Sequence, residues 1–370
     1  MMPEIAVSSP MPRVSVVVNT YNHERFIAQA LLSVLDQNFP ADQMEIIVVD
    51  DGSTDSTPQI IETFLPRIHY IRKENGGQVS AFHAGVAEAT GEILAFLDGD
   101  DWWATEKLTK VIGAFDAHPG IACVGHAYHE VDEAGSICAT MVPTVTRLSF
   151  ESPASAREAV PFRIFLGTSR FAIRRNVLER TLPVPPDVPF FDTFVFTQAI
   201  AISGAILLAE PLCCYRLHAG NLYAAQSPEN DRPRTRYALI RSHLENLPGR
   251  LAKLGLPEET ISALLGCDRV ETERLRLVLE GGKPWETFRA ERAGYQIACR
   301  DASIGYRMFT YFVLTLTLLM PPRIFYRLRA WYAAGNLRRF RERIGRVSVA
   351  SPGAVRHVGD YSKPSSSDQA

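Results

Sequence analysis

Three aspartates, Asp98, Asp100 and Asp101, follow directly after an apolar segment at residues 93–97. Carboxylates this close raise one another's pKa values unless a cation lies among them. Their oxygens are hard ligands, which suit Mg²⁺ or Mn²⁺. The same residues can also form a polar turn that opens the next helix, because negative charge is favoured at a helix N-terminus. The cluster alone leaves a cation site and a structural turn open.

Two more groups of polar residues follow apolar runs nearer the N-terminus. They are Thr20, Tyr21 and Asn22 after residues 14–18, and Asp50 and Asp51 after residues 44–49. Each apolar run has the length and composition of a buried strand. Open α/β sheets bind ligands at the carboxyl ends of their strands. We therefore expect the three polar groups to converge on one edge of a sheet.

Apolar residues at helical spacing separate the predicted strands. The helices are expected at about 25–37, 57–64, 78–89, 108–115 and 193–203, and further strands at 68–71, 121–128, 169–175, 205–209 and 212–215. Alternating strands and helices, at about 30 residues per unit, predict right-handed crossovers and a mostly parallel sheet flanked by helices. Residues 140–161 have a weak pattern and suggest a long surface loop.

The second half of the chain changes to helical spacing with many Arg and Glu residues. Near its end, apolar residues recur at helical spacing before two prolines and a series of arginines: Phe309, Phe312, Leu316 and Leu319. A basic helix beside aromatic and leucine side chains suits an anionic membrane surface. We therefore expect peripheral membrane attachment or, alternatively, a homodimer contact at this helix pair.

These patterns divide the chain into five parts. We predict a flexible arm (1–12), an α/β domain (13–226), a helical domain (227–302), an amphipathic basic helical section (303–346) and a disordered tail (347–370).

Composition restricts the classes of function. The chain has 370 residues, 46% hydrophobic and 22% charged, which is typical of a globular protein. A formal net charge of -2 gives no reason to expect nucleic acid as a partner. Six cysteines without a C-x-x-C spacing favour a reducing compartment. No signal peptide and no apolar run of about 18 residues is seen, so we expect a cytoplasmic protein at the inner face of the cell membrane.

Four segments stand in the order and at the spacing seen in family 2 glycosyltransferases. They are residues 16–22 (Val-Val-Val-Asn-Thr-Tyr-Asn), 48–55 (Val-Val-Asp-Asp-Gly-Ser-Thr-Asp), 75–77 (Asn-Gly-Gly) with Gly85, and 96–101 (Phe-Leu-Asp-Gly-Asp-Asp). The chain resembles this family over residues 13–221. The resemblance implies a Rossmann-like GT-A fold, a nucleotide-diphosphate-sugar donor, Mg²⁺ or Mn²⁺ as cofactor, and inversion at the anomeric carbon.

The resemblance also implies which residues would bind the nucleoside of the donor. Thr20 and Tyr21 would line the base, with Asn22 in the same loop. Asp50 would accept a hydrogen bond from the base, and Asp51 would lie beside it.

Other matching residues would act on the diphosphate and the acceptor. Asp98 and Asp100 resemble the family's Asp-x-Asp unit: Asp98 would contact the ribose or the metal, and Asp100 would bind the metal. Asp192 matches the catalytic base, which would take the proton of the attacking hydroxyl. Arg216 and His218 match a Tyr-Arg-x-His signature whose basic groups face the diphosphate or the metal.

The chain departs from the family pattern at two places. Phe191 stands where the family has the Glu of a Glu-Asp pair, and Phe82-His83 stands where it often has Arg-Asn. The first departure weakens the assignment of Asp192, and the second puts in doubt any donor contact from the helix at 78–89.

The predicted function is that of an inverting, metal-dependent glycosyltransferase in cell-surface glycan or lipid-linked saccharide biosynthesis. Its predicted partners are the sugar donor, a saccharide or lipid-linked acceptor, and the membrane surface. A processive polysaccharide synthase is disfavoured, because spanning helices and a Gln-x-x-Arg-Trp sequence are missing. A nucleotidyltransferase is disfavoured, because no Gly-rich phosphate loop follows the first strand. A non-catalytic nucleotide-sugar-binding or scaffold protein stays open because of Phe191.

Overall fold

The computed structural model describes residues 12–188, 191–218, 221, 232–298 and 304–331. Within them, one sheet holds ten strands. They are β1 (Val14–Thr20), β2 (Met44–Asp50), β3 (His69–Arg72), β4 (Ile93–Asp98), β5 (Trp102–Trp103), β6 (Cys123–Val131), β7 (Ile137–Met141), β8 (Arg147–Leu148), β9 (Phe171–Arg174) and β10 (Ala205–Arg216).

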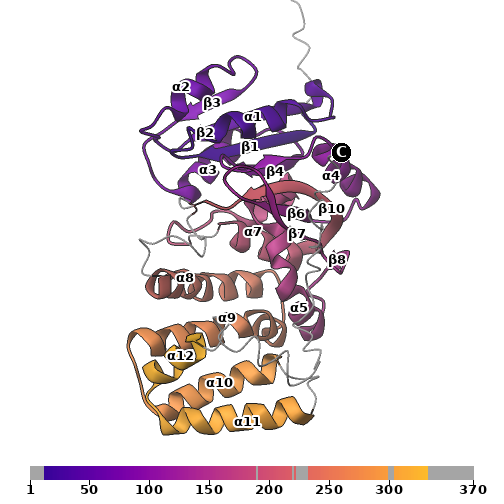
Figure 1. The fold of residues 1–370 in the computed structure, drawn as a ribbon. Helices are drawn as coiled ribbons and strands as arrows, with labels where there is room; N and C mark the ends of the chain where they lie inside the picture. The colour runs from indigo at the N-terminus through magenta and orange to yellow at the C-terminus, as the bar shows by residue number, and fades with distance from the viewer. Residues whose placement is uncertain (1–11, 189–190, 219–220, 222–231, 299–303, 332–370) are drawn as a thin grey trace, which may run out of the picture.

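The described helices fall into two sets (Figure 1). Those around the sheet are α1 (Ile27–Leu35), α2 (Thr57–Glu62), α3 (Gln78–Glu88), α4 (Lys107–Ala117), α5 (Pro153–Ala159), α6 (Arg175–Thr181) and α7 (Phe191–Ser203). Those stacked beneath it are α8 (Arg232–Lys253), α9 (Glu258–Leu279), α10 (Pro284–Ala298), α11 (Ile304–Leu319) and α12 (Pro322–Trp331). Short 3₁₀ helices are η1 (Ala41–Gln43), η2 (Val160–Leu166) and η3 (Thr168–Arg170).

The sheet confirms the predicted fold class. Its strand order is β3-β2-β1-β4-β9-β6-β10-β5, with β7 paired to β6 and β8 to β10. The longest ladders, β1 with β2, β1 with β4 and β10 with β6, are parallel. Strand β9 runs antiparallel to both of its neighbours, β4 and β6. The start of β9 therefore lies toward the sheet edge where β4 ends, and beside the beginning of β6.

Helices α3 and α7 cover one face of the sheet and pack closely against it. Strand β1 is buried along its whole length. At Gly85 of α3 a Cβ would lie 2.4 Å from a methyl carbon of Val17, so the absent side chain permits this close approach. Phe82 of α3 stacks on Phe191 of α7 with 4.2 Å between ring centroids, and Phe96 of β4 lies 5.3 Å from Phe82. This face thus has an aromatic core.

The helical region has two apolar cores. Helix α8 and the first half of α9 join the core of the sheet through side chains such as Leu247, Leu251 and Leu264. A second, smaller cluster consists of Leu277, Ala290, Phe325 and Tyr326. The predicted domain division stays a prediction, because residues 222–231 around its boundary lie outside the described residues. Residues 1–11 of the predicted arm, residues 332–346 and the predicted tail also lie outside them.

Two predictions about the middle of the chain were wrong. Residues 140–161 are not one long loop, because they include β8 and α5, a helix that Ser152 caps by accepting a hydrogen bond from the Ser155 N–H. Residues 205–209 and 212–215 are not separate strands but parts of β10, whose register shifts on both sides of Pro211. Proline lacks an N–H, so it interrupts the ladder without ending the strand. No helix in the described ranges is long and apolar enough to cross a membrane.

Candidate functional site

The ends of three parallel strands bring the predicted polar groups to one edge of the sheet. Thr20 at the end of β1 lies beside Asp50 at the end of β2. Asn19 lies beside Asp98 at the end of β4. The register therefore confirms that the three groups converge.

The two aspartates that follow β2 bind the loops around them. Asp50 is fully buried, and its Oδ2 accepts a 3.0 Å hydrogen bond from the Tyr70 hydroxyl. Asp51 accepts hydrogen bonds from the Lys73 ammonium at 2.5 Å and from the Gly77 N–H at 2.7 Å. These carboxylates hold β3 and the turn before α3 in place, which shapes this part of the edge.

The loop after β1 is joined to the loop after β2. Asn22 has a left-handed backbone, with φ 55°, which its short polar side chain tolerates. Its N–H donates to Ser53 Oγ at 2.9 Å, and its Oδ1 accepts from the Thr54 N–H at 2.8 Å. Tyr21 remains 44% exposed, so its ring is free to stack on a ligand.

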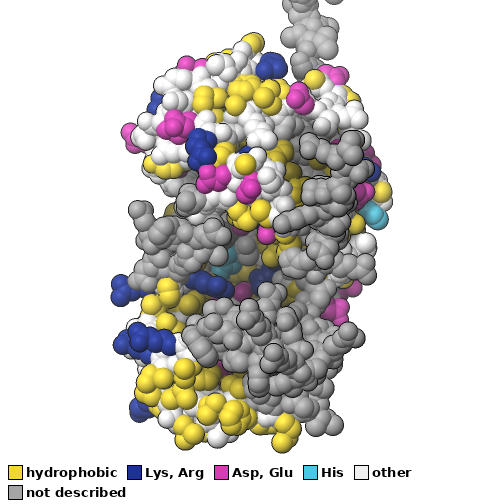
Figure 2. Space-filling view, in the orientation of Figure 1, with side chains coloured by type: hydrophobic (Ala, Val, Ile, Leu, Met, Phe, Trp, Pro, Cys, Tyr) yellow, Lys and Arg dark blue, Asp and Glu magenta, His cyan; other side chains and the backbone are white. Residues whose placement is uncertain are grey.

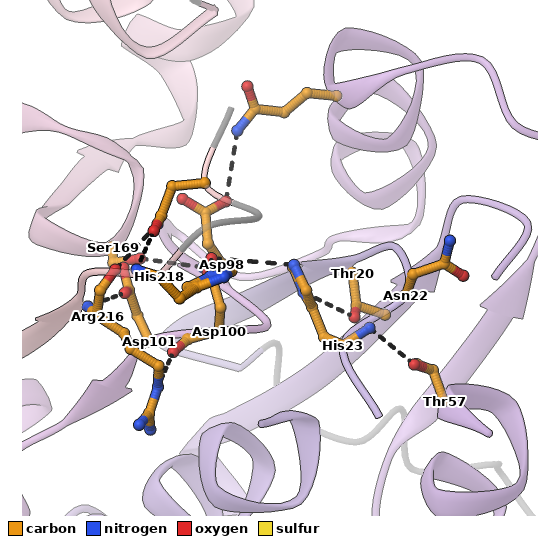
Figure 3. Close-up of polar contacts among 12 residues, drawn as sticks. Thr20, Asn22, His23, Thr57, Asp98, Asp100, Asp101, Ser169, Arg216 and His218 are labelled. Atoms are coloured by element: carbon orange, nitrogen blue, oxygen red, sulfur yellow. Dashed lines mark hydrogen bonds and ion pairs between the residues drawn. The ribbon is translucent and has the colours of Figure 1, made fainter. Parts of the chain in front are cut away.

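Asp100 lies between two histidines (Figure 3). His218 Nε2 is 2.9 Å from its Oδ2, and His23 Nε2 is 3.9 Å from the same oxygen. Burial raises the pKa of Asp100, but the hydrogen bond with His218 and the two imidazoles outweigh that effect and leave it lowered. Burial lowers the pKa of His23. Asp100 is thus held in its charged form.

Arg216 ties the acidic loop to the rest of the site. Its N–H donates to Asp101 Oδ1 at 2.9 Å, and its Nε donates to the Asp100 carbonyl at 2.9 Å. Its two terminal nitrogens donate to the Glu133 carbonyl at 2.8 Å and to Gln29 Oε1 at 2.6 Å. Burial and the neighbouring Asp100 raise the pKa of Asp101 to about 7. These bonds fix the acidic loop and engage the guanidinium of Arg216 with protein groups, and its contact with a diphosphate stays a prediction.

Asp98 and Asp192 line the same cavity, of about 380 Å³. Asp192 opens α7, and it accepts hydrogen bonds from the Thr168 N–H at 3.2 Å and the Thr193 N–H at 2.5 Å. Burial, together with Asp100, Asp101 and Asp192, raises the pKa of Asp98 well above its usual value. Burial also raises the pKa of Asp192. The predicted base and the first residue of the predicted Asp-x-Asp unit therefore share one space.

Sequence reasoning missed several residues of this cavity. Ser169 Oγ accepts from the Asp98 N–H at 3.1 Å. The Arg170 guanidinium lies 4.3 Å from the Tyr128 ring and 5.1 Å from the Tyr215 ring, and it also lines the cavity. The available signal was an arginine directly before the apolar residues 171–173 of the predicted strand. His23 was missed as well, although it directly follows the predicted loop at residues 20–22.

Among the described residues, no group of three or more His, Cys, Asp and Glu side chains is arranged to hold a metal ion. The predicted ligands Asp100 and His218 do lie together, with Asp98 two residues away in the chain. A larger hollow, of about 550 Å³, lies around residues 117–121 and 200–204 and includes none of the predicted site residues. The 380 Å³ cavity is therefore the candidate site.

Comparison with known proteins gives a consistent picture. Residues 15–181 match the profile described as glycosyl transferase family 2. An uncharacterized glycosyltransferase of Nostoc sp. is 32% identical over 222 residues, which are 56% of this chain and 66% of that protein. The poly(ribitol-phosphate) beta-N-acetylglucosaminyltransferase TarS of Staphylococcus aureus is 35% identical over 112 residues, 29% of this chain and 20% of TarS. The chain thus spans less than two thirds of the length of either relative.

A solved structure supports the fold. The crystal structure of S. aureus TarS residues 1–349, in complex with UDP-GlcNAc, aligns with a TM-score of 0.52 and 21% identity. The alignment covers 77% of this chain and 80% of that one. At this level of identity the likeness establishes a shared fold that extends beyond the α/β domain.

Proposed function

Because residues 15–181 match the glycosyl transferase family 2 profile, we propose that this chain transfers a sugar from a nucleotide-diphosphate sugar to a hydroxyl group. The observation that carries this proposal is the pairing of Asp98 and Asp192 in one cavity at the carboxyl edge of the sheet. A donor bound along this edge would present its sugar to the space where Asp192 lies. The alternative of a non-catalytic scaffold loses support, since Phe191 does not displace the carboxylate beside it.

The proposed chemistry needs one base. Asp192 takes the proton of the attacking hydroxyl, and its raised pKa makes it a stronger base than an exposed aspartate. The diphosphate leaves as an anion and needs no protonating acid. Inversion at the anomeric carbon follows from a single displacement on the face that Asp192 borders.

The residues at the edge have the chemistry that a hard divalent cation prefers. Asp98 and Asp100 supply carboxylate oxygens and His218 an imidazole, and the raised pKa of Asp98 marks a site where positive charge is in demand. We propose that Asp100 and His218, which already lie together, would hold Mg²⁺ or Mn²⁺ when a donor is bound, with Asp98 as the third candidate ligand. The cation would stabilise the charge that develops on the diphosphate.

The nucleoside would bind over the loops after β1 and β2. Tyr21, exposed, would stack on the base, with Thr20 and Asn22 beside it. Asp50 and Asp51 would act mainly by holding these loops, since their oxygens already accept hydrogen bonds from the protein. Because TarS is named an N-acetylglucosaminyltransferase, UDP-N-acetylglucosamine is the first donor to test.

The test is a screen of UDP-, GDP- and dTDP-sugars, with and without Mn²⁺, for a rise in melting temperature. A ligand that binds the native state raises that temperature. With the donor found, Asp192→Asn should bind it normally and transfer sugar about 10²–10⁴ times more slowly. Transfer by Asp192→Asn at the wild-type rate would exclude this base. Donor binding without transfer by the wild-type protein would favour the scaffold.

We also propose that helices α11 and α12 attach the protein to a membrane surface, where a lipid-linked saccharide would be the acceptor. Both helices turn large apolar side chains outward, and Figure 2 shows them gathered at the lower end of the molecule. They are Met308, Tyr311, Phe312, Leu318, Leu319, Ile324 and Leu328, 46% to 73% exposed. The neighbouring Arg323 and Arg327 are exposed and would face anionic headgroups.

Deletion of residues 303–370 tests this attachment. The truncated protein should no longer sediment with vesicles of phosphatidylglycerol, whereas the full chain should, and more weakly in high salt. An unchanged vesicle-bound fraction would contradict the proposal. Loss of a dimer on truncation, without vesicle binding by the full chain, would favour a homodimer instead.

A further inference from the structure

We propose that helices α8 and α9 supply the acceptor-binding wall of the cavity, through His243 and Asp268 with Arg163, and that this wall takes an uncharged saccharide. The inference rests on the proposed function, because it assigns the acceptor side of the same site. None of these three residues follows from the family motifs, which end near residue 221.

The cavity is bounded by two parts of the chain that lie far apart in sequence. Asp98 and Asp192 come from the α/β domain, whereas His243 comes from α8 and Asp268 from α9. Figure 1 shows α8 running directly beneath the sheet domain, with α9 below it. The helical region therefore closes the space next to the proposed base, on the side where a second substrate must enter.

Arg163 and Asp268 form a charge-balanced pair at this wall. The two terminal nitrogens of Arg163 lie 3.3 and 3.4 Å from the two carboxylate oxygens of Asp268. These bonds are longer than the usual 2.7–2.9 Å of such pairs. Both groups are partly exposed, so the guanidinium can still donate to a hydroxyl group and the carboxylate can still accept from one. A pair of this kind fits two neighbouring hydroxyls of a sugar ring.

His243 adds an unsatisfied polar group. Its side chain is 5% exposed, and its Nε2 has no hydrogen-bond partner among the described protein atoms. Burial lowers the pKa of His243 to about 4, so the ring is neutral at pH 7. A buried ring nitrogen without a partner is costly, and because Nε2 has almost no exposed surface, the ring would have to turn for a sugar hydroxyl to reach it and remove that cost.

The remaining wall residues and the charge argue for the class of ligand. Ile164, Phe196 and Ile240 line the same cavity and offer apolar surface for the carbon face of a sugar. The ion pair and the neutral imidazole carry no net charge. Beyond this wall, the carboxyl groups of Asp98, Asp101 and Asp192 outnumber the one cation, Arg170, that lines the cavity with them among the described residues, so a second anion is disfavoured. The wall therefore favours a neutral saccharide over a phosphorylated or carboxylated one.

The test uses the full chain and two substitutions that keep side-chain size, His243→Phe and Asp268→Asn. Arg269→Gln is the matched control, since Arg269 is exposed on α9 next to Asp268 and does not line the cavity. Saturation-transfer NMR titrations with methyl β-glucoside, methyl α-mannoside and methyl N-acetyl-β-glucosaminide measure binding. We expect at least one glycoside to bind the wild type and Arg269→Gln equally and each of the two variants about tenfold more weakly.

The shift in melting temperature with UDP-N-acetylglucosamine and the other donors is measured on the same samples. Donor shifts should be unchanged in both variants, which also shows that they fold. Equal glycoside binding by all proteins, binding of none of the glycosides, or tighter binding of glucose 6-phosphate would each overturn the assignment of this wall. If no donor shifts the wild type, the proposed function fails, and glycoside binding then reports on the wall alone.

Discussion

The sheet edge buries charged side chains, whereas the α11–α12 pair exposes apolar ones. At the sheet edge, Asp50, Asp101 and Arg216 are buried and hydrogen-bonded. On α11 and α12, by contrast, Phe312 and Leu319 are 61% and 73% exposed. A buried charge and an exposed apolar surface are both costly unless something else requires them.

The two regions therefore lower the stability of the fold in different ways: the sheet edge by burying charges, and the helix pair by exposing apolar side chains. The edge keeps charges in place before a ligand arrives, so its polar groups are oriented by the protein itself. The helix pair leaves large apolar side chains exposed within the part of the chain that the structure describes. The same kind of substitution made in each region should therefore have different effects on stability and on binding.

The largest effect is expected from placing one charge in each region. Phe191→Glu puts a carboxylate into the aromatic core against Phe82 and should destabilise the fold by about 3–5 kcal/mol. Phe312→Glu, on the exposed face of α11, should change stability by about 0.5 kcal/mol or less and weaken vesicle binding about tenfold. Urea unfolding and vesicle sedimentation measure the two effects.

The double variant Phe82→Arg/Phe191→Glu sharpens this test. The resemblance to the family places Arg and Glu at these two positions, and here the two phenyl rings are in contact. The second substitution should therefore recover part of the stability lost with Phe191→Glu. Additive losses would show that the two departures from the family pattern are independent of each other.

Arg216→Lys should have the next largest effect. Lysine cannot reproduce the three guanidinium bonds to the Asp100 carbonyl, the Glu133 carbonyl and Gln29, so we expect a loss of about 1–3 kcal/mol. Arg327→Lys on α12 is the control and should leave stability and vesicle binding unchanged. Equal melting temperatures of both variants would mean that the buried charge at the edge is not held in place by these bonds.

Gly167→Ala tests how tightly the cavity is packed. A Cβ at Gly167 would lie 2.0 Å from a terminal nitrogen of Arg170, so the guanidinium must move away from Tyr128 and Tyr215. We expect a loss of about 1–2 kcal/mol and slower transfer. Gly113→Ala in α4, where a Cβ meets nothing within 4 Å, should preserve both. Normal transfer by Gly167→Ala would remove Arg170 from the site.

The smallest effect concerns pH. Transfer requires Asp192 to be deprotonated, so the rate should fall as pH falls through the pKa of Asp192, which burial raises above 3.8. Thr168→Val removes a hydroxyl 3.4 Å from the carboxylate, and should move this acidic limb to higher pH. The pH dependence of the transfer rate measures both. If the fall in rate at low pH occurs at the same pH in Thr168→Val, a group other than Asp192 controls it.

Much of the edge was predictable from sequence, because apolar runs with polar ends identify parallel strands and their common edge. The register then placed Thr20 beside Asp50 as expected. The sequence also predicted the position of Asp192 at the start of a helix.

The other side of the cavity was not predictable in this way. Residues 160–170 form 3₁₀ helices, whose short length gives no useful periodicity. His243 and Asp268 reach the cavity only because α8 and α9 fold back beneath the sheet. That is a long-range packing event, and no local pattern around either residue reports it.

The reversed direction of β9 determines where the sequence of this protein can vary. Since β9 begins at the sheet edge, the segment that leads into it, rather than the one that follows it, borders the substrates. Between β6 and β9 the chain also forms β7, β8 and α5, but the connections at residues 132–136, 142–146 and 149–152 can lengthen or shorten without disturbing a strand. Insertions and deletions in these connections would therefore change the acceptor side of the proposed site while the carboxyl ends of β1, β2 and β4 stay unchanged.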